Sequence, residues 1–222
     1  MAQHFSPRIV TEGMVLCLDA ANRESYVGSG SSWVDLVSSS NNHTLVNTPT
    51  FSTSNGGYLA FNGTNQYATA VGPAVGTNSF TVEIWAYPTS SPANCVLFDT
   101  NSADNVGDGI MFSYVGGTFN FRYFGSFSPL ISTSLTSGRW YHMVMSRIGT
   151  TVTGYINGTS VGTFTEAARN MSSTKYTLGT FTTRNNFFFP GYISIVRVYN
   201  TKGLTASEVS QNFSALRGRY GV

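Results

Sequence analysis

The sequence predicts an all-β protein built as a two-sheet antiparallel sandwich with one short helix at its C-terminal end. Three observations predict this fold. Short segments alternate apolar and polar residues, Asn-Gly and Gly-Gly pairs separate them, and helical periodicity occurs only near the end of the chain. A length of 222 residues suits one sandwich, so we expect a single domain over 1–222, with an N-terminal arm over 1–12.

The expected strands are eleven segments of about the length that an antiparallel sandwich uses. They are 14–20, 57–63, 80–88, 95–100, 110–116, 118–124, 140–148, 151–157, 159–165, 175–181 and 192–200. Asn157-Gly158 suits a primed turn, which predicts a hairpin from Tyr155 to Val161. Strands do not alternate with helices, which excludes a doubly wound parallel sheet and a dinucleotide site built on one.

One helix is expected at the end of the chain, within 205–222. Thr205 and Glu208 have the spacing of a capping box, and Val209, Phe213 and Leu216 then form an apolar stripe. We expect this stripe to cover a rim of the sandwich.

Charge and composition restrict the partners. Only 10% of residues are charged, the formal net charge is +2, and no run of Lys or Arg occurs, so we expect no nucleic acid partner. No apolar stretch reaches the roughly 18 residues of a membrane span, so no membrane insertion is expected, and the first residues lack the pattern of a secretory signal. Cys17 and Cys95 lie in apolar segments, which predicts buried, reduced thiols.

Several motifs, in their order along the chain, resemble laminin-G-like, concanavalin A-like jelly-roll domains of the kind found in virion proteins of tailed phages. The motifs span nearly the whole chain and lie at 13–20, 26–36, 59–67, 80–85, 138–144, 155–158 and 191–200. The resemblance implies a jelly roll with one concave sheet and loops at its rim. It does not imply a single function, because the fold carries lectins, glycosidases, adhesion modules and capsid proteins.

Catalysis is not expected. A glycosidase needs two carboxylates about 5 to 10 Å apart, and Glu83 is the one acid on its strand, with Trp85 and Tyr87 at the alternate positions. His142 alternates with apolar residues on its strand and suits a hydrogen-bonded interior imidazole. The sequence thus predicts a non-enzymatic protein.

Carbohydrate binding is a candidate function for aromatic residues, because pyranose CH groups pack on aromatic faces while polar neighbours bind the hydroxyls. The candidate ligand-binding residues, if their strands form the concave sheet, are Glu83, Trp85, Tyr87, Arg122 and Tyr123. The alternative for each aromatic ring is packing in the core of the sandwich.

No cofactor is expected, and calcium is the one candidate ion. The loop from Asp99 to Gly109 contains Asp99, Asp104 and Asp108 together with two amides, and oxygen ligands of this kind suit calcium. The spacing is not that of an EF-hand, and the alternative is a solvated turn.

An interface with other subunits is expected where aromatic residues cannot all face inward. Phe187, Phe188 and Phe189 are consecutive, so strand alternation turns at least one ring away from the core. The alternative is that the rim loops or the closing helix cover that ring. The candidate interface residues are Trp33, Phe124, Phe127, Phe187 and Phe188.

These expectations combine into one functional hypothesis: a non-enzymatic phage virion protein, located on the virion as a capsid decoration or as part of the tail. Its expected partners are other virion proteins, further copies of itself in a homo-oligomer such as a trimer, and a host-surface glycan. One alternative is a carbohydrate-binding module from a secreted bacterial protein. The third is a glycoside hydrolase.

Overall fold

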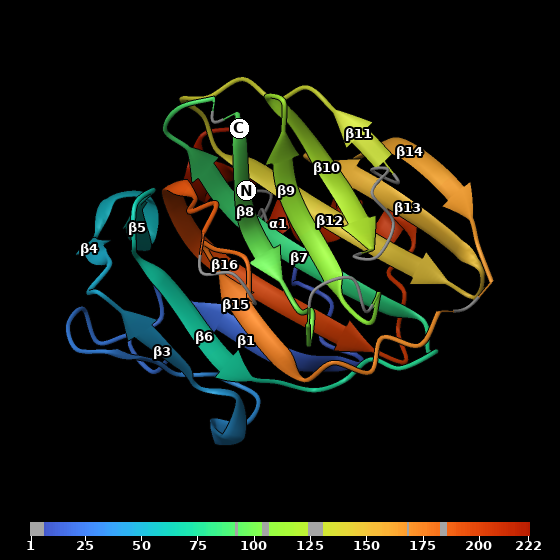
Figure 1. The fold of residues 1–222 in the computed structure, drawn as a ribbon, viewed down its shortest axis with the longest axis horizontal. Helices are drawn as coiled ribbons and strands as arrows, with labels where there is room; N and C mark the ends of the chain where they lie inside the picture. Colours follow the sequence, from blue (N-terminus) through green and yellow to red (C-terminus); the bar gives the residue numbers. More distant parts are fainter. Residues whose placement is uncertain (1–6, 92, 104–106, 124–130, 168, 183–185) are drawn as a thin grey trace, which may run out of the picture.

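The computed structural model describes residues 7–91, 93–103, 107–123, 131–167, 169–182 and 186–222 and has two antiparallel eight-stranded sheets (Figure 1). Sheet A has the order β14 (Thr159–Thr165), β13 (Thr151–Ile156), β12 (Tyr141–Ile148), β7 (Phe80–Pro88), β16 (Pro190–Asn200), β5 (Tyr58–Asn62) and β4 (Thr50–Ser52), with β1 (Met14–Asp19) also paired to β16. Sheet B has the order β11 (Ile131–Thr133), β10 (Thr118–Tyr123), β9 (Ile110–Val115), β8 (Asn94–Asp99), β15 (Lys175–Leu178), β6 (Tyr67–Val71), β3 (His43–Val46) and β2 (Ser32–Trp33).

The predicted two-sheet sandwich is confirmed, and each of the eleven predicted segments contains a strand. Five further strands, β2, β3, β4, β6 and β11, were not predicted. They have two to five residues and are rich in Thr, Ser and Ala, so they lack the large alternating apolar residues that identify a strand. Two short 3₁₀ helices, η1 (Ser39–Asn41) and η2 (Ser54–Gly56), connect strands of this region.

The main core lies between the two sheets and is strongly aromatic. Within it, the ring of Phe112 has the ring centroids of Phe98, Phe119 and Phe121 at 5.8, 6.1 and 4.8 Å in edge-to-face geometry. Each such pair contributes about 0.5–1.5 kcal/mol beyond its buried area. Trp33 belongs to the same core and is 0% exposed, so its predicted place in an interface is wrong.

The two thiols are placed as the sequence predicts. Cys17 and Cys95 are both buried and unbridged. Burial raises the pKa of each thiol, to about 12 for Cys95, so both side chains act as small apolar groups.

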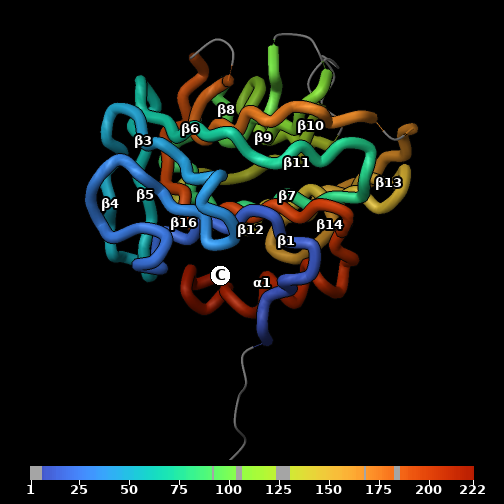
Figure 2. The backbone as a smooth tube through the Cα atoms, turned by 90° about the horizontal axis from the view of Figure 1, so that it is seen from below, coloured from blue at the N-terminus to red at the C-terminus, as the bar shows by residue number. Residues whose placement is uncertain are grey.

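Helix α1 (Ala206–Tyr220) forms a third layer (Figure 2). The capping box is present: the side chain of Thr205 accepts a hydrogen bond from the backbone of Glu208, and the Glu208 carboxylate accepts one from the backbone of Thr205. The helix packs on the outer face of sheet A, where Val209 is 0% exposed, so the prediction that it covers a rim is wrong. Sheet A is therefore covered by sheet B on one face and, in part, by α1 on the other.

Candidate functional site

The five predicted ligand-binding residues do not form one site. Glu83 and Trp85 are 0% exposed, beneath α1 on the outer face of sheet A, and Tyr123 lies in the core between the sheets. Arg122 alternates with Tyr123 on β10, so it lies on the outer side of sheet B, where it is partly exposed. Tyr87 is the one of the five that is partly exposed on sheet A. The predicted carbohydrate face is thus wrong for Glu83, Trp85 and Tyr123, and divided between two sheets for the others.

Glu83 is the centre of a buried polar cluster that joins sheet A to α1. Its carboxylate accepts hydrogen bonds from Arg197 at 2.7 Å and from Asn212 of α1 at 2.7 Å, and Nε2 of His142 lies 3.2 Å away. Burial alone would raise the pKa of Glu83, but the charge of Arg197 and the contacts with His142 and Asn212 outweigh burial and hold the pKa at about 2. The carboxylate is therefore ionised and engaged within the fold.

Other aromatic rings enclose Trp85, which is 0% exposed. Its ring stacks on Tyr220 of α1 with centroids 4.2 Å apart and on His142 at 4.9 Å, while Phe213 lies at 5.9 Å. A sugar ring cannot reach a face that another ring already covers. Trp85 thus anchors the C-terminal half of the helix to the sheet.

Beyond the end of the helix, three tyrosines form a row across sheet A. Tyr58 of β5, Tyr192 of β16 and Tyr87 of β7 stack in this order, with centroids 4.4 and 5.0 Å apart and rings within 18° of parallel. We call these three residues the tyrosine row. Trp140, which is buried, packs edge-on against Tyr58 and Tyr87 at 5.7 and 5.6 Å. The row is thus rigid, because each ring is held by the next and by Trp140.

The tyrosine row presents hydroxyl groups. All three residues are partly exposed, and none of their hydroxyls makes a hydrogen bond within the part of the chain that the structure describes. Partial burial and the neighbouring hydroxyls of Tyr58 and Tyr87 raise the pKa of Tyr192, so its phenol stays neutral. Each of the three hydroxyls can both donate and accept a hydrogen bond. Because the ring faces are stacked on each other, a ligand would contact the ring edges and the hydroxyls.

Sequence reasoning identified Tyr87 but missed Tyr58, Tyr192 and Trp140. Tyr192 is the direct cross-strand partner of Tyr87 on β16, a pairing that depends on the register of two strands far apart in the sequence. The signal that could have found the row is weak: Tyr58 and Tyr192 each stand near the start of a predicted strand.

The predicted calcium loop is described in part. The buried carboxylate of Asp99 accepts hydrogen bonds from the backbone of Thr182 at 2.9 Å and of Asn101 at 3.1 Å, and burial raises its pKa to about 6. Asp108 accepts from the backbone of Ser102 at 3.1 Å, while Asp104 lies outside the described residues. Among the residues that are described, no three His, Cys, Asp or Glu side chains gather as metal ligands. Calcium binding here stays a prediction.

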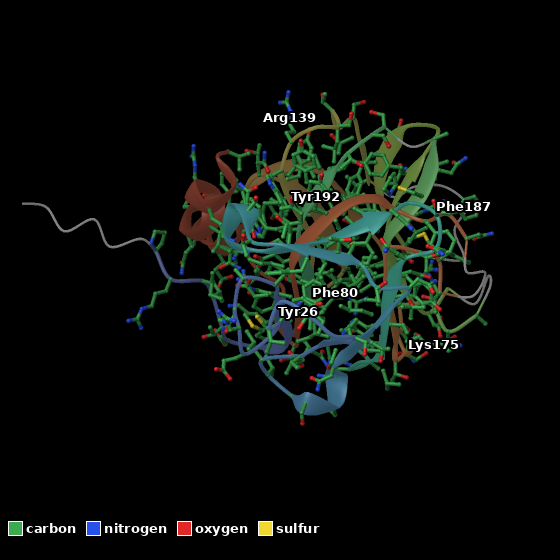
Figure 3. The ribbon with its side chains drawn as sticks, turned by 90° about the vertical axis from the view of Figure 1, so that its left-hand side faces the viewer. Tyr26, Phe80, Arg139, Lys175, Phe187 and Tyr192 are labelled. Carbon is green, nitrogen blue, oxygen red and sulfur yellow. The ribbon has the colours of Figure 1, made fainter. Side chains whose placement is uncertain are left out.

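The predicted interface aromatics are placed in part. Phe187 is 44% exposed, Phe188 is partly exposed and lies 6.4 Å from the ring of Tyr67, and Phe189 is in the core. The prediction that one of the three rings points outward is confirmed. Figure 3 shows Phe187 on the side of the molecule away from α1. Phe124 and Phe127 lie outside the described residues.

Within the described residues, no helix has the length and apolar character needed to cross a membrane.

Comparison with known proteins gives a family and structural neighbours. The family described as the concanavalin A-like lectin/glucanases superfamily matches residues 61–210. No curated protein matches the chain. Trypanosoma rangeli sialidase, solved in complex with sialic acid, is similar at a TM-score of 0.70 and 17% identity, over 97% of this chain and 36% of the sialidase. The receptor-binding domain of botulinum neurotoxin type G is similar at a TM-score of 0.67 and 15% identity, over 91% of this chain and 51% of that domain. The chain thus spans about a third to a half of these neighbours, and the likeness concerns the fold.

Proposed function

Because the chain belongs to the concanavalin A-like lectin/glucanase superfamily, we propose that it is a non-enzymatic recognition module, that its tyrosine row binds carbohydrate, and that a virion carries it. One observation carries the binding part of this proposal. Three phenol hydroxyls lie side by side on a rigid aromatic support, with no partner among the described residues. Sugar hydroxyls donate and accept hydrogen bonds, as phenols do, so the two surfaces are chemically complementary.

The contacts of Glu83, the acid on β7, support the proposed absence of catalysis. Hydrolysis of a glycosidic bond needs a carboxylate that reaches the substrate. The carboxylate of Glu83 is enclosed by Arg197, His142 and Asn212, so it would have to leave an ion pair and α1 would have to move before it could act. A measured hydrolysis of oligosaccharides would overturn this part.

The virion setting is the finer part of the proposal and is supported by the resemblance of the sequence to virion domains of tailed phages. In that setting many copies of a weak site act together on a host-surface glycan, which raises the overall affinity. Homo-oligomers such as trimers and contacts with capsid or tail proteins belong to the same proposal.

The runner-up is a carbohydrate-binding module of a secreted bacterial protein, which uses the tyrosine row in the same way. Copurification with phage particles distinguishes the two.

The experiment that tests the binding site is a glycan array probed with multivalent protein. A triple variant with Tyr58→Phe, Tyr87→Phe and Tyr192→Phe keeps the stacked rings and removes the hydroxyls. We expect it to bind about tenfold more weakly or worse, because three hydrogen bonds are lost. Tyr67→Phe, which removes the hydroxyl of a partly exposed tyrosine on sheet B, is the matched control. Equal binding by the triple variant and the wild type would overturn the proposed site.

A further inference from the structure

Arg139 lies next to the tyrosine row on a short turn whose position is fixed. The turn is held to the end of β7 by the backbone hydrogen bond from Gly138 to Pro88 at 2.8 Å. A Cβ atom on Gly138 would lie 3.9 Å from the hydroxyl of Tyr87, so the turn runs beside that hydroxyl. The residue that follows Arg139 is Trp140, which packs against the row. Figure 3 shows Arg139 extending outward at the end of the molecule where Tyr192 lies.

No residue in the described part of the chain neutralises the charge of Arg139. Its side chain is exposed, and it forms no ion pair or hydrogen bond with any residue that the structure describes. The other arginine close to the row differs in this respect. Arg219 lies 3.1 Å from the carboxylate of Asp19 and donates to the carbonyl of Gly57 and to Ser194. Arg139 is therefore the uncommitted cation beside the three hydroxyls in the described chain.

We propose that the site is specific for acidic glycans, in which a sugar carboxylate pairs with Arg139 while neighbouring sugar hydroxyls bind Tyr87 and Tyr192. This inference rests on the proposed function and adds the class of ligand to it. A guanidinium binds a carboxylate through two parallel hydrogen bonds, which fix the orientation of the carboxylate. A neutral sugar has no carboxylate and cannot form this pair. The fixed turn lowers the entropy lost on binding, because the backbone that carries Arg139 is already in place.

Charge complementarity identifies this ligand in preference to a neutral sugar. With 10% charged residues the chain has few charges to offset Arg139. Its unpaired guanidinium therefore gives the surface beside the tyrosine row a positive potential. That potential attracts anionic ligands and is screened by salt. Binding of an acidic glycan should therefore weaken as the salt concentration rises, and binding of its neutral counterpart should not.

The test compares matched pairs of immobilised glycans, sialyllactose with lactose and a glucuronic acid-terminated disaccharide with its glucose-terminated counterpart. The proteins are the wild type, Arg139→Gln, Arg139→Lys and, as a control for charge, Arg23→Gln, which removes an exposed arginine on another loop. Melting curves confirm that all four proteins are folded. We expect the wild type and Arg23→Gln to prefer the acidic member of at least one pair. Arg139→Gln should reduce this preference about tenfold, and Arg139→Lys should restore part of it.

Two results would overturn the inference in different ways. If the wild type binds acidic and neutral members equally, or if Arg139→Gln keeps the preference, the class of ligand is wrong while carbohydrate binding stands. If the wild type binds no glycan on the array, the proposed function fails and the inference fails with it.

Discussion

Glu83 and Arg197 are direct cross-strand partners on β7 and β16, and their side chains form an ion pair of 2.7 Å that is closed off from water by α1. Their exposed fractions are 0% and 3%. A buried pair of this kind adds little net stability by itself, since both charges lose their hydration. Its importance lies in what happens when one partner is removed, because the other charge is then left uncompensated.

Glu83→Gln should destabilise the fold by about 3–5 kcal/mol, because Arg197 would keep its charge in a buried environment without a counter-ion. Denaturant unfolding of the variant and the wild type measures the difference. Glu24→Gln, at an exposed position, is the control and should change the free energy of unfolding little. A Glu83→Gln protein as stable as the wild type would show that α1 does not enclose the pair in solution.

Stability should depend on pH through Asp99. Burial raises the pKa of Asp99 from 3.8 to about 6, despite the hydrogen bonds from Thr182 and Asn101. Between these two values the folded state binds more protons than the unfolded state, so the free energy of unfolding falls as the pH rises, by on the order of 2–3 kcal/mol. Asp99→Asn should remove this slope, which urea unfolding at a series of pH values would detect.

Glu83 should change the stability with pH in the opposite direction to Asp99, so the two contributions can be told apart. Its pKa in the folded state is lowered from 4.5 to about 2, so its contribution is present above about pH 4.5 and is lost as the pH falls toward 2. As the pH rises, Asp99 therefore lowers the free energy of unfolding, mainly between about pH 4 and 6, whereas Glu83 raises it, mainly between about pH 2 and 4.5. A slope between pH 4 and 6 that persists in Asp99→Asn would contradict the role of Asp99.

Much of the fold could be predicted from local sequence patterns, and the site could not. Alternation correctly placed Glu83, Trp85 and Tyr87 on one face of β7, and the spacing of Thr205 and Glu208 correctly predicted the start of α1. What covers that face depends on a helix more than a hundred residues later, so the local pattern alone leaves Glu83 and Trp85 on an open surface. A local pattern reports which residues share a face and not which element packs on it.

The attachment of the N-terminal segment around Val10 should depend on the side chain of Asn212. The Asn212 side chain accepts a hydrogen bond from the backbone of Val10 at 2.8 Å and donates to Glu83 and to the hydroxyl of Tyr199 at 3.1 Å. Asn212→Ala should destabilise the protein by about 1–3 kcal/mol, because buried groups lose their partner. It should also accelerate hydrogen exchange of the Val10 amide. Ser210→Ala, on the exposed side of α1, is the control, and unchanged exchange at Val10 in Asn212→Ala would contradict the link.

Self-association should depend on Phe187, if the proposed oligomer uses the aromatic run. Phe187 has a φ of 58°, and its carbonyl accepts a hydrogen bond from the backbone of Val96 at 2.8 Å, so the backbone that carries the exposed ring is held in place. Asn tolerates this left-handed conformation better than Phe, so Phe187→Asn removes the ring without adding backbone strain. We expect the melting temperature to stay the same or rise and light scattering to show a smaller assembly. Val27→Asn removes another exposed apolar side chain, 65% exposed, and should leave the assembly unchanged. An oligomer that persists in Phe187→Asn would exclude this ring from the interface, and a wild type that is monomeric at high concentration would contradict the homo-oligomer itself.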